Sequence, residues 1–188
     1  KYKDLNKDGK IDEKDVRDIG YPKYPLYTAG MNLGVSWKGF DFNVFFQGSQ
    51  GNDVLNMTLR DFESGTGTMN AREDFLNRAW NGEGSTDKYH RISAEQGQNS
   101  EISDYFVEDG SYLRLKNLQL GYNFCERLLK IKGISYLRLY VSAQNLFTLT
   151  KYSGLDPEIG SSNATLNGID QGFYPQARIW TVGLNIKF

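Results

Sequence analysis

The chain has 188 residues and a formal net charge of -1, with 14% aromatic residues and 20 glycines. The near-neutral charge excludes a basic field that would attract nucleic acid, so no nucleic-acid partner is expected. The aromatic residues and glycines favour an all-β chain with many turns, and the absence of a long apolar run excludes a transmembrane helix.

The first element along the chain is an acidic segment within residues 1–24 that has the spacing of a calcium loop. Five side-chain oxygens and one backbone carbonyl form the candidate metal ligands, which are Asp4, Asn6, Asp8, Lys10, Asp12 and Asp15. Asp15 is shorter than the usual Glu at the last position, as in dockerin-type loops. Two interpretations stay open: a Ca²⁺ site, or an Asx-rich turn that folds without metal. No organic cofactor is expected.

Five runs of alternating apolar and polar residues follow, and each predicts a β-strand with one apolar face. The expected strands cover residues 25–38, 40–52, 111–124, 135–149 and 176–188. Lys38 and Gly39 separate the first two runs, which predicts a tight hairpin. The third run changes parity, so a one-residue bulge near Lys116 and Asn117 is expected to restore a single apolar face.

The strands and their connections have the proportions of a transmembrane β-barrel. Runs of ten or more residues match the length of about nine to eleven that a tilted membrane strand needs. Short connections, residues 38–39 and 125–134, alternate with long polar ones, residues 53–110 and 151–175. This alternation predicts an antiparallel up-and-down meander in which residues 1–24 and both long connections are extracellular.

Five strands cannot close a barrel that encloses a lumen, so the chain is interpreted as a fragment of a longer protein. A soluble β-sandwich is the alternative fold. In the barrel, one face of the sheet is expected to contact lipid. The residues expected on this lipid-facing side are Met31, Leu33, Val35, Phe42, Val44, Leu139, Val141, Val182 and Leu184.

Phe188 follows the apolar residues of the last expected strand. We expect it to act as an assembly signal, because the last strand of a barrel must pair with the first and an unpaired edge in lipid is costly. An aromatic residue at this place also fits an interfacial girdle. The other interpretation is that Phe188 is one more lipid-facing residue.

The chain lacks the residue sets typical of an enzyme active site, and we expect no enzyme. His90 is the only histidine, so no histidine pair is present for a metal and no Ser–His–Asp set stands out. Aromatic residues in or beside the long connections could stack on a ligand or pack these connections together. These candidate ligand contacts are Trp80, Tyr89, Tyr105, Phe173 and Tyr174.

Five sequence segments together resemble a known protein family. They are residues 4–12 (DLNKDGKID), 45–53 (FFQGSQGND), 108–118 (EDGSYLRLKNL), 137–148 (LRLYVSAQNLFT) and 152–158 (YSGLDPE). In this order they resemble the C-terminal part of SusC/RagA-type TonB-dependent outer-membrane transporters. The resemblance implies a large barrel with an N-terminal plug, energised by TonB, in the outer membrane of a Gram-negative bacterium. It also implies a SusD-like surface lipoprotein that closes over the barrel mouth.

The expected function is therefore part of an active importer of oligosaccharides or peptides. Residues 53–110 are expected to face outward and contact the lipoprotein or the cargo. The alternative is a calcium-dependent carbohydrate-binding or dockerin-like module, which predicts a second calcium repeat and a soluble fold. A surface hydrolase is a third class, which the missing catalytic residues disfavour. The family does not name the substrate, because its specificity is spread over plug, loops and lipoprotein.

Overall fold

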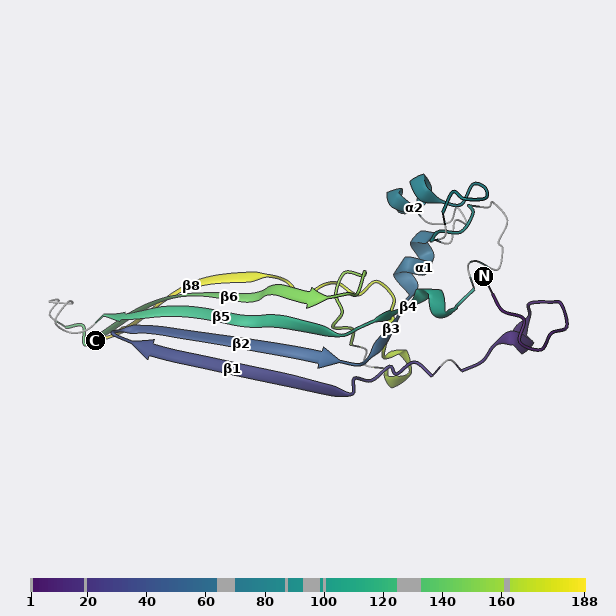
Figure 1. Ribbon diagram of the computed structural model, residues 1–188. Helices are drawn as coiled ribbons and strands as arrows, with labels where there is room; N and C mark the ends of the chain where they lie inside the picture. The colour runs from purple at the N-terminus through teal and green to yellow at the C-terminus, as the bar shows by residue number, and fades with distance from the viewer. Residues whose placement is uncertain are drawn as a thin grey trace.

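Five long antiparallel strands form one sheet in the computed structural model (Figure 1). The structure describes residues 2–18, 20–63, 70–86, 88–92, 99, 101–124, 133–160 and 163–188. The long strands are β1 (Tyr27–Trp37), β2 (Phe40–Gln50), β5 (Tyr112–Phe124), β6 (Tyr136–Thr150) and β8 (Ile179–Lys187). Their order is β1-β2-β5-β6-β8, and every neighbouring pair is antiparallel. The predicted all-β up-and-down meander is confirmed.

The hairpin and the bulge follow from local backbone requirements. Lys38 and Gly39 have φ of 47° and 91°, and a type I′ turn between twisted strands requires positive φ at both central residues. The register of β5 shifts between Leu115 and Asn117, and Asn145 on β6 has a φ of 51°. The predicted bulge is confirmed, and the apolar residues on both sides of it share one face.

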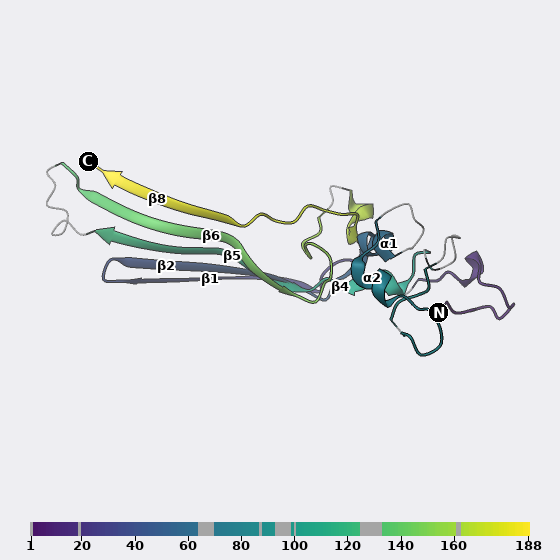
Figure 2. The ribbon, with the colours of Figure 1, turned by 90° about the horizontal axis from the view of Figure 1, so that it is seen from above.

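The two kinds of connection lie at opposite ends of the sheet (Figure 1). The β1–β2 turn and the C-terminus lie at one end, which we call the turn end. The segments before β1, between β2 and β5, and between β6 and β8 lie at the other, which we call the loop end. Of the second short connection, residues 125–132 lie outside the described part of the chain. Figure 2 shows that β6 and β8 curve between the two ends.

The loop end carries a second sheet that the sequence analysis did not predict. Its strands are β3 (Asp53–Asn56), β4 (Val107–Asp109) and β7 (Ile169–Asp170), in the order β4-β3-β7. β3 is antiparallel to β4 and parallel to β7. The connection between β2 and β5 is therefore paired, through β3, with the connection between β6 and β8.

Short helices complete the loop end. They are α1 (Met57–Glu63) and α2 (Glu73–Arg78), with 3-10 turns η1 (Glu13–Asp15), η3 (Asp104–Phe106) and η4 (Ala164–Leu166). Among the described helices, none is long and apolar enough to cross a membrane. α1 begins directly after β3, where the side-chain oxygen of Asn56 accepts a hydrogen bond from the backbone N–H of Leu59 at 2.8 Å. This bond satisfies one of the unpaired N–H groups at the start of a helix.

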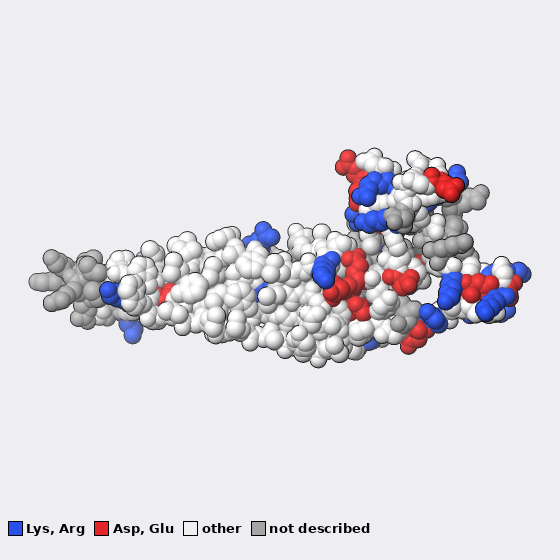
Figure 3. All heavy atoms as spheres, in the orientation of Figure 1, with Lys and Arg blue, Asp and Glu red and all other residues white. Residues whose placement is uncertain are grey.

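Burial and charge also differ between the two ends. The buried apolar side chains of the loop end include Val54, Phe75, Tyr89, Phe106 and Tyr152, whereas the long strands bury Val44, Leu115 and Ala143. In the view of Figure 3, charged side chains gather at the loop end and the visible side of the long strands is largely uncharged. The loop end therefore has a hydrophobic core of its own, while the large sheet leaves much apolar surface exposed.

Candidate functional site

The register places the apolar side chains of the five long strands on one side of the sheet, which we call the apolar face. Residues directly opposite each other on neighbouring strands point to the same face. One such row consists of Val35, Phe42, Leu120, Val141 and Val182. The strand alternation puts all nine residues predicted to face lipid on this face.

Most of the apolar face is exposed. Val182 is 72% exposed and Met31 is 52% exposed, whereas Val44 is 7% exposed in the middle of the sheet. Soluble monomers rarely expose contiguous apolar patches larger than a few hundred Å². Contact of this face with lipid stays a prediction, and the exposure is what such contact requires.

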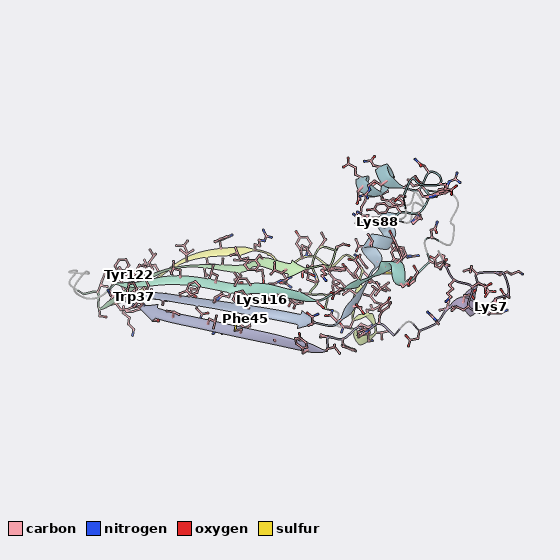
Figure 4. All side chains as sticks on the ribbon, viewed as in Figure 1. Lys7, Trp37, Phe45, Lys88, Lys116 and Tyr122 are labelled. Carbon is pink, nitrogen blue, oxygen red and sulfur yellow. The ribbon has the colours of Figure 1, made fainter. Side chains whose placement is uncertain are left out.

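Aromatic residues cluster where the apolar face reaches the turn end (Figure 4). Trp37, Phe40 and Tyr122 occupy one row, and the ring centroids of Phe40 and Tyr122 are 4.6 Å apart. The Nζ of Lys38 lies 4.7 Å from the Trp37 ring centroid. Aromatic residues of this kind form girdles where a barrel crosses the membrane–water interface. Phe188 is exposed at the same end, and its role in assembly stays a prediction.

The opposite side of the sheet, which we call the polar face, carries an ion pair near the turn end. Arg138 on β6 donates hydrogen bonds to both carboxylate oxygens of Asp41 on β2, at 3.0 and 2.5 Å. Asn123 on β5 donates to Asp41 at 3.2 Å and accepts from the hydroxyl of Tyr136 at 2.6 Å. The network joins three strands and pairs the two charges with each other on the polar face.

A second charged network fastens the segment after β6 to the polar face at the loop end. Arg114 on β5 is buried and donates to Asp156 at 2.5 Å, to Glu158 at 2.7 Å and to the Thr148 hydroxyl at 2.8 Å. Lys116 also donates to Glu158, at 2.8 Å. Residues 152–158, which we call the clamp, are thereby held against β5 and β6.

The clamp also binds the second sheet. The hydroxyl of Tyr152 donates to Asp170 on β7 at 2.5 Å, and both groups are buried. The backbone N–H and the hydroxyl of Ser153 donate to Glu108 on β4, at 2.8 and 2.7 Å. The clamp thus connects the large sheet with β4 and β7 of the second sheet.

The ion pairs of the clamp were not predicted from the sequence. A signal for them was present, because Arg114 and Lys116 are two residues apart and so are Asp156 and Glu158. Two cations in one segment and two anions with the same spacing in a distant segment favour a double ion pair. The sequence gives no way to see that the two segments meet.

The surroundings of the clamp shift the pKa values of its buried groups. Burial tends to raise the pKa of the Asp156 carboxyl, but backbone N–H groups of Gln176 and Glu158 and the Arg114 guanidinium outweigh it, so the pKa lies below its ordinary value. Burial and the hydrogen bond to Asp170 raise the pKa of the Tyr152 hydroxyl. Asp156 is therefore held as an anion and Tyr152 as a neutral donor at neutral pH.

The predicted ligand-contact aromatics divide into buried and exposed residues. Tyr89 is buried, packs against Phe75 with centroids 5.8 Å apart, and donates to Asp74 at 2.8 Å. Tyr89 follows the second interpretation of these aromatics, because it packs the loop end together. Tyr105 donates to Glu63 at 2.7 Å and keeps part of its ring exposed. Trp80, Phe173 and Tyr174 are exposed as well, so four of the five candidates remain open to a ligand.

The acidic segment folds around its own backbone. Asp4 accepts hydrogen bonds from the N–H groups of Lys7 and Gly9, at 2.5 and 2.8 Å. Asp15 accepts from the N–H groups of Leu5 and Asp12, at 2.7 and 2.9 Å. Among the described residues, no group of three or more His, Cys, Asp or Glu is placed to hold a metal ion. The hydrogen bonds match the Asx-rich turn, and calcium binding stays a prediction.

The chain is similar in sequence to several TonB-dependent receptors. No family model matches the chain. The chain is 42% identical over its whole length to TonB-dependent receptor P3 of Formosa agariphila, of which it covers 19%. It is 33% identical over its whole length to TonB-dependent receptor SusC of Bacteroides thetaiotaomicron, of which it covers 17%.

Solved structures agree with these relatives. The RagAB peptide importer in its open-open state matches 95% of the chain with a TM-score of 0.80 and 28% identity, and the chain covers 19% of that protein. A structure of the RagAB peptide transporter matches with a TM-score of 0.79 and 30% identity over the same shares. The aligned part includes both the long strands and the loop end, because little of the chain is left out.

The five long strands are therefore strands of a transmembrane β-barrel. Within this class, the chain is a segment related over its whole length to TonB-dependent receptors of the SusC/RagA type, as the five sequence segments predicted. It spans about a fifth of the length of these relatives. The relatives are named as receptors or importers, which is compatible with the expectation that the chain is no enzyme.

Proposed function

We propose that the chain forms part of the wall of a nutrient importer in the outer membrane of a Gram-negative bacterium. The observation that carries this proposal is the exposed apolar face across five long strands. β1 has 11 residues, so it rises about 34 Å and spans about 24 Å when tilted by about 45°. The apolar band of an outer-membrane barrel is about 25 Å tall. The strand length and the band therefore agree.

In this proposal the apolar face meets lipid and the polar face borders an aqueous lumen. Adjacent residues of β8 test it, because Val182 lies on the apolar face and Thr181 on the polar face. Spin labels on Val182→Cys and Thr181→Cys are placed in the full-length receptor with Cys125→Ser. The label at 182 should collide with lipid-soluble oxygen and the label at 181 with a water-soluble nickel complex. The reverse pattern would refute the assignment of the faces.

The relatives support two further parts of the proposal: energy supplied through TonB, and oligosaccharides or peptides as cargo. SusC is a TonB-dependent receptor by name, and RagAB is a peptide importer by name. Growth of the source bacterium on single oligosaccharides and on peptide mixtures would identify the cargo. Loss of TonB should abolish this growth, and uptake that continues without TonB would contradict the proposal.

A SusD-like lipoprotein is the proposed partner of the loop end. The described parts of residues 53–110 lie at one end of the sheet, where a partner that closes the barrel mouth would sit. Deletion of residues 64–100 removes α2 but leaves β3 and β4, so the second sheet has its strands. The deleted receptor should insert normally yet capture less lipoprotein and support slower uptake. Normal capture together with normal growth would count against this partner.

Calcium binding is proposed for the acidic segment because its oxygen-bearing residues have calcium-loop spacing. Titration calorimetry of the full-length receptor should give a calcium signal that Asp4→Asn and Asp15→Asn abolish. Asp18→Asn is the matched control, since Asp18 lies outside the six candidate ligands. A receptor without any calcium signal would leave the metal-free turn as the correct interpretation.

A further inference from the structure

A cavity lies beneath the clamp, where the chain that leads into β8 separates from β6. It has a volume of about 380 Å³, within the range of about 300 to 1,000 Å³ that small-molecule sites occupy. Thr148 and Thr150 line it from the polar side of β6, and Leu155 lines it from the clamp. Gln176 and Arg178 line it from the segment before β8.

The charges around this cavity are unequal. Arg114 also lines the cavity, but its guanidinium is engaged by Asp156 and Glu158. Arg178 is exposed, and within the described part of the chain it makes no ion pair. The cavity therefore offers one cation whose charge has no counterpart in its walls. A guanidinium presents a planar fork of donors that matches both oxygens of a carboxylate.

Neutral groups of the cavity suit the rest of such a ligand. The side chain of Asn145 is fixed by a hydrogen bond from its Nδ2 to the backbone oxygen of Ala177 at 2.9 Å, which leaves its Oδ1 as an acceptor. The Thr148 oxygen accepts from Arg114, so the Thr148 hydroxyl proton is directed elsewhere. Leu155 adds an exposed apolar surface. Donors, acceptors and an apolar wall together fit a small polar molecule.

We propose that this cavity binds a carboxylate group of the imported ligand through Arg178, with Asn145 and Thr148 as neutral hydrogen-bonding partners. The proposal deepens the proposed function, since it rests on the chain being part of an importer. Acidic sugars and the C-termini of peptides both carry the required carboxylate. The shared chemistry is the carboxylate, and the two sources are separate arms of the test.

The test compares acids with their neutral counterparts on the full-length receptor. One arm uses digalacturonic acid and its dimethyl ester, and the other uses trialanine and its C-terminal amide. In at least one arm the acid should bind roughly tenfold to a hundredfold more tightly than its counterpart, as a charge-assisted hydrogen bond provides. Arg178→Gln should reduce this ratio to near one. Lys187→Gln, which removes a cation at the other end of β8, should leave the ratio unchanged.

The outcomes separate this proposal from the function on which it rests. A ratio near one in both arms of the wild-type receptor overturns the carboxylate site, and this measurement needs no variant to fold. A ratio that Arg178→Gln leaves unchanged also overturns it. In either case, continued TonB-dependent uptake by the same receptor would show that the importer proposal stands. Loss of TonB dependence would overturn the importer proposal instead.

Discussion

Arg138 and Asp41 pair across the full width of an intervening strand. The guanidinium on β6 reaches over Gly121 of β5 to the carboxylate on β2. A Cβ atom at Gly121 would lie 2.5 Å from an Asp41 oxygen and 2.7 Å from Nη2 of Arg138. The glycine is therefore what allows two strands that are not neighbours to be joined through their side chains.

Gly121→Ala should separate Arg138 from Asp41 and destabilise the full-length receptor, by about 1 to 3 kcal/mol, because two charged groups lose their partners. Gly34→Ala is the matched control, since its nearest neighbour would be at an ordinary 3.5 Å. Urea unfolding of the receptor in detergent would measure both variants. Equal stability of the two would show that the ion pair contributes nothing measurable.

Val182→Lys should impair insertion of the receptor far more than Thr181→Lys. Lysine on the lipid face of a barrel costs about 2 to 4 kcal/mol near the middle of the membrane, whereas the lumen face accepts a charge. The heat-modifiable fraction in isolated outer membranes measures insertion of each variant. Similar insertion of the two variants would contradict the assigned orientation of β8.

Arg114→Met should release the clamp from β5. Removal of one partner from a buried ion pair leaves an uncompensated charge and costs about 3 to 5 kcal/mol, and here Asp156 would be left behind. The double variant Arg114→Met with Asp156→Leu should recover part of this loss. Hydrogen exchange of residues 152–158 in the intact receptor reports the release. Unchanged protection in the single variant would show that Ser153 and Tyr152 suffice to hold the clamp.

The clamp should be independent of pH across the neutral range and release in acid. The pKa of Asp156 in the folded protein lies below its ordinary value of 3.8, so its stabilising effect is present above that value and disappears as the pH falls through the lowered pKa. Hydrogen exchange, corrected for its intrinsic pH dependence, should therefore change little between pH 8 and pH 5. The acid transition should be weaker in Asp156→Asn but not absent, because Glu158, Glu108 and Asp170 also hold the clamp. A transition between pH 5 and pH 8 would point to another group.

Deletion of Phe188 should lower the amount of folded receptor in the outer membrane but leave uptake per folded molecule near normal. The reason is that Phe188 directly follows β8, and a strand edge left unpaired in lipid leaves backbone groups without partners. Heat-modifiability measures folding, and uptake of labelled nutrient measures transport. Full insertion, or normal insertion with lost uptake, would show that Phe188 is not an assembly signal.

The long strands were predictable because each carries its own alternating pattern over nine or more residues. Even the bulge was readable, since Leu113 and Leu118 differ in parity. The second sheet was not predictable, because β3, β4 and β7 have four, three and two residues. Strands this short show no period, and their pairing depends on partners far away in the chain.

The residues of the candidate sites also differ in how far the sequence predicts them. The residues of the apolar face follow from alternation within a strand, so the sequence places all nine on one side. The partners of Arg114 do not follow, because Asp156 lies 42 residues further along the chain and alternation says nothing about which loop folds back. The role of Tyr89, ligand contact or packing, was not predictable for a related reason. An aromatic residue in a long connection does not indicate whether a hydrophobic core forms there.

The parallel pairing of β3 with β7 sets an order of events during assembly. Leu55 pairs with Ile169, so the two partners are separated by most of the chain. Closing so large a loop costs conformational entropy before the contact contributes any stabilisation. This pairing is therefore favourable only after β5 and β6 have brought the partners near. The second sheet should therefore form last. An early assembly intermediate of the receptor would contain the five paired long strands without the pairing of β3 with β7.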